Sequence, residues 1–179
     1  KRHYASARRK WQAIQKTNEY NLRKNMKYSK ISVILHWVSV PLLAFLLLSG
    51  TFVLSNIPNT LEKLPNIKLH SILGFVVMVL SLVRLYFIFG SKTEPLKMSP
   101  ARALLLKANH AGIYLCVFLI ALSGFALNLQ SGVAGAIMSG ANDFSMYESM
   151  SEYLCGSIHK VLTKILPLLI VMHVLGVFS

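Results

Sequence analysis

Four long stretches of apolar residues dominate the sequence, and each is almost free of charge. They cover residues 31–54, 67–89, 106–129 and 157–178. Arg84 is the one charged residue between 69 and 89, and Lys160 and Lys164 lie in the first two turns of the fourth stretch. A helix of about 20 apolar residues crosses the roughly 30 Å hydrocarbon layer of a bilayer. The pattern therefore predicts four membrane-spanning helices.

The connections between these stretches predict how the helices are arranged. Residues 55–64 contain one proline and two asparagines, residues 90–100 contain two prolines, and both connections are short. Short connections make neighbouring helices antiparallel. We therefore predict an all-α fold over residues 29–179, an integral membrane four-helix up-and-down bundle. The longer connection, residues 130–156, is rich in glycine and is expected to cap one end of the bundle.

Composition agrees with a membrane protein, because 54% of the residues are hydrophobic and 14% are charged. The net charge of +13 is unevenly distributed. Residues 1–30 hold ten Lys or Arg and one acid, the connection between the second and third spans is also basic, and residues 130–156 hold acids and no Lys or Arg. This positive-inside pattern places the N-terminus on the cytoplasmic side, or in the matrix of a mitochondrion. Topology and anionic lipid explain the charge better than nucleic acid does.

Residues 1–28 form a basic arm ahead of the first span. Its composition is typical of a solvated or lipid-touching segment. A docking arm for a partner subunit is the alternative.

Histidines lie in every predicted span. Ionisable residues within a membrane are rare and usually functional. His36 and His173 lie near the inner ends of their spans, and His70 and His159 lie near the outer ends. Two pairs of imidazoles at two depths result.

The fourth span carries one histidine of each pair. His159 and His173 are fourteen residues apart, which is a rise of about 21 Å and a rotation about 40° short of whole turns. Both rings therefore face the same side, as two stacked haems require, with His36 and His70 as second ligands. A zinc site would need ligands that converge at one point. No Cys-x-x-Cys-His motif is present, so covalent haem is excluded and two noncovalent b-type haems are predicted.

The same interval of fourteen residues links other inward-facing positions. Arg84 follows His70 by fourteen residues, at the depth of the inner haem, where its guanidinium suits a propionate. Gly50 and Gly124 follow the histidines of the first and third spans in the same way. These glycines would let a macrocycle approach the backbone at the outer level. Plain helix packing by small residues is an equal alternative.

His110 lies near the inner end of the third span, at a depth similar to His36 and His173. Three roles remain open for it. It could replace one of the ligands, contact a propionate or the head group of a quinone, or serve packing alone.

Several short motifs lie around these histidines. They are Tyr28-Ser29-Lys30, Leu35-His36-Trp37, Lys68-Leu69-His70, Leu82-Val83-Arg84-Leu85, Asn109-His110 with Tyr114, Ile158-His159-Lys160 and Met172-His173. With these motifs the chain resembles the bacterial cytochrome b561 and hydrogenase-type cytochrome b family over about residues 28–178. The resemblance implies a two-haem, four-helix protein of the bacterial inner membrane that exchanges electrons with ubiquinone or another quinone. It also implies that His36 and His173 hold the inner haem and that His70 and His159 hold the outer one.

Two imidazoles on each iron leave no open position for oxygen, so one-electron transfer is the expected chemistry. A quinone-linked oxidoreductase is the leading hypothesis. A haem-bearing accessory or anchor subunit of a larger respiratory or hydrogenase-like complex is the alternative, favoured by the basic arm and the acidic connection. A bc-type cytochrome b would need two helices that each carry a spaced pair of histidines, whereas here the fourth span alone carries such a pair. A channel or transporter, in which histidines line a proton path, ranks last.

Overall fold

The computed structural model describes residues 10–18, 30–90, 99–140 and 149–178. Tyr28, Lys92, Lys97 and most of the basic arm lie outside these ranges. A helix covers residues 10–18 of the arm, which the sequence analysis did not predict. The remaining elements are α2 (Lys30–Leu48), the π-helix η1 (Ser49–Leu54), the 3-10 helix η2 (Leu61–Lys63), α3 (Leu64–Phe89), α4 (Pro100–Gln130), α5 (Val133–Ser139), the 3-10 helix η3 (Met150–Glu152) and α6 (Leu154–Phe178).

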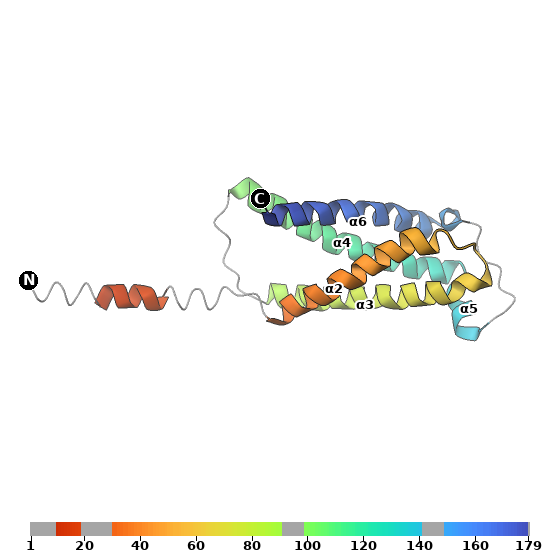
Figure 1. Ribbon diagram of the computed structural model, residues 1–179, viewed down its shortest axis with the longest axis horizontal. Coiled ribbons are helices and arrows are strands. Elements are labelled where there is room, and N and C mark those ends of the chain that lie inside the picture. Colours follow the sequence, from red (N-terminus) through yellow and green to blue (C-terminus); the bar gives the residue numbers. More distant parts are fainter. Residues whose placement is uncertain (1–9, 19–29, 91–98, 141–148, 179) are drawn as a thin grey trace, which may run out of the picture.

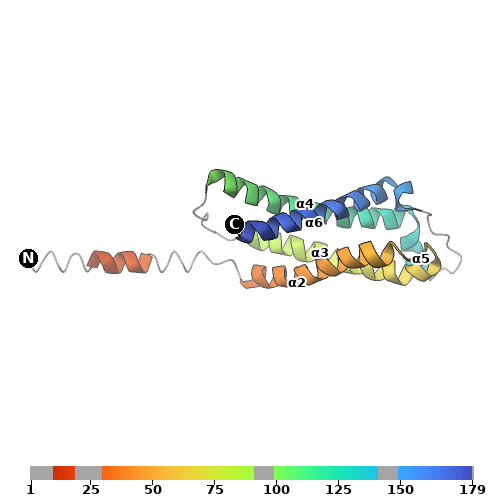
Figure 2. The same cartoon turned by 45° about the horizontal axis from the view of Figure 1, so that its top comes forward.

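Four helical segments are long and apolar enough to cross a membrane, namely Lys30–Leu54, Leu61–Phe89, Pro100–Gln130 and Leu154–Gly176. Each contains one of the predicted spans almost entirely, so the four predicted spans are confirmed. Consecutive long helices run in opposite directions (Figures 1 and 2). The predicted all-α membrane bundle is therefore confirmed as well.

The four long helices associate as two pairs. Helix α4 packs along α6 and α2 packs along α3, whereas α2 and α6 hardly approach each other through their backbones. Both ribbon views show the two pairs lying against each other (Figures 1 and 2). The histidines of α2 and α3 therefore belong to one pair of helices, and those of α6 belong to the other.

An apolar layer fills the bundle at mid-height. Its most deeply buried members are Val77 and Leu166, which are 2% and 1% exposed. Leu166 lies seven residues, about two helical turns, from both His159 and His173. Packed side chains of all four long helices thus separate the two histidine levels; the core of this layer is Leu46, Val77, Cys116, Val117 and Leu166.

Large apolar side chains cover the outside of the bundle. Phe75, Phe125 and Leu168 are 60%, 62% and 66% exposed, on three different helices. A surface this apolar is suited to lipid and not to water. The outer face of the bundle therefore contacts membrane lipid.

Helix α4 begins earlier than its apolar stretch does. The sequence predicted a span from residue 106, whereas the helix starts at Pro100, with the Ser99 side chain accepting a hydrogen bond from the Arg102 backbone N–H (3.4 Å). Serine at the N-cap followed by proline in the first turn is a typical helix start. The added residues, 100–105, contain Pro100 and the charged Arg102, which interrupt the apolar pattern ahead of residue 106.

The connection from 130 to 156 is partly helical. Helix α5 lies in it at the end of the bundle opposite the end of α6 (Figure 1). Gly132 and Gly140 flank α5 with φ angles of 75° and 66°, a backbone region that glycine adopts without strain. Val133 of α5 is fully buried, so the predicted capping segment packs against the bundle.

Candidate functional site at two levels of the bundle

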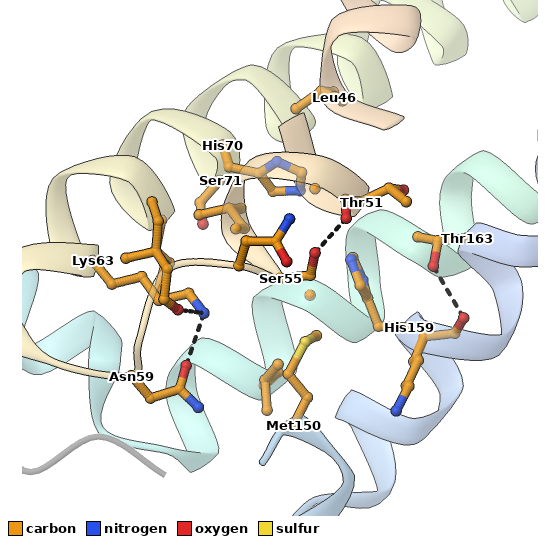
Figure 3. Close-up of a pocket in the computed structure, with 18 of the residues that line it drawn as sticks. Leu46, Thr51, Ser55, Asn59, Lys63, His70, Ser71, Met150, His159 and Thr163 are labelled. Carbon is orange, nitrogen blue, oxygen red and sulfur yellow. Dashed lines mark hydrogen bonds between the residues drawn. The ribbon is translucent and has the colours of Figure 1, made fainter. Parts of the chain in front are cut away.

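His70 of α3 and His159 of α6 face each other at the outer level. Their ring centroids are 6.5 Å apart, and the ring planes are inclined by 68°. Both side chains point into a cavity of about 610 Å³ (Figure 3). This volume is within the usual range of ligand sites, about 300–1,000 Å³.

Two glycines lie directly against these imidazoles. A Cβ atom on Gly50 would lie 3.3 Å from Cε1 of His70, and a Cβ atom on Gly124 would lie 3.0 Å from Cε1 of His159. Carbon atoms normally approach to about 3.5–4.0 Å. A histidine ring thus lies against each glycine, and the approach of a macrocycle to their backbone stays a prediction.

The two outer imidazoles differ in their hydrogen bonds. Nδ1–H of His159 donates to the carbonyl oxygen of Ile120 at 2.9 Å, and the Ser123 hydroxyl donates to the same oxygen at 3.0 Å. Nδ1 of His70 is buried without a hydrogen-bond partner among the described residues. The bond to Ile120 fixes the His159 tautomer and leaves the lone pair of Nε2 for a metal.

His36 of α2 and His173 of α6 form the inner pair. Their ring centroids are 6.3 Å apart, with an angle of 75° between the planes. The His110 ring lies closer to His173, at 4.7 Å and 88°. His110 is itself exposed, and its Nδ1–H donates to the carbonyl oxygen of Leu106 at 2.7 Å.

Arg84 reaches the inner level, as its spacing from His70 predicted. Its guanidinium carbon lies 5.8 Å from the centre of the Tyr114 ring, which allows a cation–π contact. Nε of Arg84 and Nδ1 of His173 are both buried without a hydrogen-bond partner among the described residues. The buried Nε–H of Arg84 is a donor and calls for an acceptor.

Asn109 is a residue of the inner level that the sequence analysis named only as part of a family motif. It is 6% exposed. With its amide oriented to satisfy both ends, it donates to the Leu169 carbonyl at 3.3 Å and accepts from the His173 backbone N–H at 3.0 Å. Asn109 therefore holds the turn of α6 that carries His173. A buried polar residue on an apolar helix was the available signal.

The spacing of the imidazoles can be compared with what an iron porphyrin requires. An imidazole nitrogen binds a transition metal at about 2.0–2.1 Å and its ring centre lies about 1.1 Å farther out, so two imidazoles on opposite sides of one metal have centres about 6.3 Å apart. The two pairs, at 6.3 and 6.5 Å, fit this value. His110 and His173, at 4.7 Å, do not. Within the described part of the chain, no three His, Cys, Asp or Glu side chains converge as a metal-ion site would need.

A four-helix membrane bundle with opposed imidazoles at two depths has the architecture of a membrane cytochrome. Residues 27–179 match the family model described as prokaryotic cytochrome b561, and the chain belongs to this family. It is accordingly a multi-pass bacterial membrane protein of the haem b, electron-transferring class. No curated protein and no solved structure matches the chain.

Proposed function

We propose that the chain holds two haem b groups and relays single electrons between the two faces of the membrane. The inner group would be held by His36 and His173, and the outer one by His70 and His159. The observation that carries this proposal is the pair of centroid distances, 6.3 and 6.5 Å, across the space between the two helix pairs. Each distance suits one iron between two imidazoles.

A haem with two imidazole ligands supplies reversible one-electron chemistry and leaves no open coordination position. The protein's own part is to hold the rings. His159 is fixed by the Ile120 carbonyl, and Gly124 leaves room for its ring. At the inner level Asn109 fixes the backbone of His173, and Arg84 offers a guanidinium group, whose Nε is buried, to a carboxylate.

The apolar layer between the levels has its own role in a relay. Leu166 and Val77 are almost completely buried there, so water and ions are kept out of the middle of the bundle. An ion in this layer would lose several kcal/mol of hydration. Electrons can then pass between the levels while protons and ions do not.

Orientation and domain organisation are part of the same proposal. Residues 29–179 would form the membrane domain, with residues 1–28 as a basic arm on the cytoplasmic side of the bacterial inner membrane. Arg102 and Lys107 lie at the inner end of α4, whereas Glu152 lies next to the outer start of α6. The basic arm and the basic second connection, set against the acidic residues of 130–156, follow the positive-inside rule.

A quinone is the proposed partner at the inner level. His110 is exposed and its ring lies 4.7 Å from that of His173. Because its Nδ1–H is held by the Leu106 carbonyl, Nε2 is left as an acceptor for a quinol hydroxyl. This places a proton acceptor beside an electron acceptor, as oxidation of a quinol requires.

Haem quantitation in the purified protein tests the proposal. We expect two haems per chain in the wild type, and one in each of the variants His70→Ala and His173→Ala. The two variants should retain haems of different midpoint potential. His110→Ala is the matched control and should retain both. One haem per wild-type chain, or loss of the same haem in both variants, would refute the two-level relay.

A further inference from the structure

Lys63 is a buried cation at the outer level. It ends η2, two helical turns before His70, and is 8% exposed. Its ammonium group donates to the carbonyl oxygen of Ile57 at 3.1 Å and to Oδ1 of Asn59 at 2.8 Å. Both acceptors are neutral. Burying a lysine is unfavourable unless an anion compensates its charge, so this position calls for a negative partner.

Lys63 lines the same cavity as His70 and His159 (Figure 3). Lys160 and Lys164 of α6 line it too, and none of the described residues around the cavity is acidic. A hollow with low-dielectric walls concentrates the potential of the charges at its edge. The outer cavity is therefore a positively charged site.

The cavity also has an apolar part. Leu46, Leu54 and Leu127 contribute to its walls, on three different elements. A molecule that fills it should be flat or bulky and apolar, with anionic groups toward the lysines. Its centre should accept an imidazole from each side. An amphipathic tetrapyrrole with carboxylate side chains has this combination of properties.

We propose that Lys63 binds a propionate carboxylate of the outer haem and raises the reduction potential of that haem. The proposal rests on the function proposed above and assigns a residue to it. An ammonium group has three N–H donors, and the two bonds to Ile57 and Asn59 leave one for the carboxylate. These two bonds also fix the position of the Lys63 charge.

Lys160 and Lys164 have a weaker claim to this role. Both are exposed, and long side chains near a membrane surface extend readily toward lipid headgroups. Lys63 is held on two sides by the connection that follows η1. The effect of the charge should therefore reside mainly in Lys63.

Redox titration of the complete haem-loaded protein tests this role. Lys63→Gln removes the charge and keeps an N–H donor, Lys63→Arg keeps the charge, and Lys68→Gln changes an exposed lysine of α3 that does not line the cavity. We expect Lys63→Gln to lower the reduction equilibrium constant of the outer haem about tenfold, which is 59 mV for one electron. The inner haem of Lys63→Gln should keep its wild-type potential. Both haems of Lys63→Arg and of Lys68→Gln should do so as well.

Several outcomes decide between a charged and a merely structural role. Loss of the outer haem in Lys63→Gln with rescue by Lys63→Arg also supports the proposal. An unchanged potential in Lys63→Gln, or loss of the outer haem in both variants, overturns it. Absence of an outer haem from the wild type instead refutes the proposed function.

A soluble anion, instead of a haem propionate, is the other candidate for the negative partner of Lys63. Titrating the wild type in chloride and in acetate at equal ionic strength separates the two sources. If a propionate occupies Lys63, the outer potential is the same in both salts. If the outer potential follows the salt in the wild type and not in Lys63→Gln, the site takes soluble anions and the proposal is wrong.

Discussion

Replacing Gly124 by alanine tests whether the outer site depends on the position of one imidazole. The new Cβ atom would lie 3.0 Å from Cε1 and 3.1 Å from Nδ1 of His159, so the ring must move by several tenths of an ångström. Such overpacking costs about 1–3 kcal/mol. Movement also weakens the 2.9 Å bond to the Ile120 carbonyl, which contributes about 1 kcal/mol.

A gain in helix propensity opposes this loss. Alanine is favoured over glycine within a helix by about 1 kcal/mol. The net loss at the outer site is then about 1–3 kcal/mol, which corresponds to a decrease of about 5- to 100-fold in affinity for the outer haem. The inner level lies about 21 Å away and should not change.

Competition with apo-myoglobin measures haem dissociation from each site. Gly124→Ala should lose the outer haem about 5- to 100-fold faster and keep the wild-type rate for the inner one. Gly74→Ala is the matched control, because a Cβ atom on Gly74 of α3 has no neighbour within 4 Å. Wild-type dissociation in Gly124→Ala, or equal effects at both levels, would contradict the reasoning from the His159 ring.

Two further substitutions test the inner level. Arg84→Gln removes the guanidinium, whose Nε is buried without a hydrogen-bond partner among the described residues. In a redox titration the potential of the inner haem should therefore fall by about 60 mV. Arg102→Gln, at the exposed start of α4, should leave this potential unchanged. Asn109→Leu removes two bonds to α6 and should cost about 2 kcal/mol, with changes confined to the inner haem spectrum. Asn128→Leu, which removes a 2.8 Å bond to Ser71, should affect the outer haem instead.

The sequence was sufficient for the four spans, and it predicted that His36 shares a depth with His173 and His70 with His159. Both follow from one-dimensional information, since a residue's distance from the end of an apolar stretch sets its depth in the membrane. His36 and His173 are far apart in the chain, yet their rings are 6.3 Å apart. Depth can be inferred from the sequence because the bilayer gives the four helices a common frame.

Features that depend on the path of the backbone could not be predicted in this way. The π-helix at Ser49–Leu54 lies where Gly50 meets His70. Nothing in its apolar sequence distinguishes it from an α-helix. The burial of Lys63 likewise depends on the connection that brings Ile57 and Asn59 to its ammonium group. In sequence, Lys63 is simply one more lysine near the end of a span.

The role of His110 shows how a distance reduces a set of alternatives. Sequence depth alone allowed His110 to replace either inner ligand. Its ring centre is 4.7 Å from that of His173, about 1.6 Å less than two imidazoles across one metal require. Ligation of one iron jointly with His173 would therefore need a helix to move, whereas contact with a propionate or a quinone would not.

The interval of fourteen residues has a structural explanation in the middle of each helix. In each of the four long helices, one residue lies midway between the two positions that are fourteen residues apart. These midpoint residues are Leu43, Val77, Val117 and Leu166, and all four belong to the central apolar layer or pack against it. Seven residues are nearly two whole turns, so the same face of each helix carries a polar or small residue, then a buried apolar one, then a second polar or small residue. One repeated face thus builds two polar levels and the barrier between them. A channel for protons would need polar residues at the midpoint, and these four side chains argue against it.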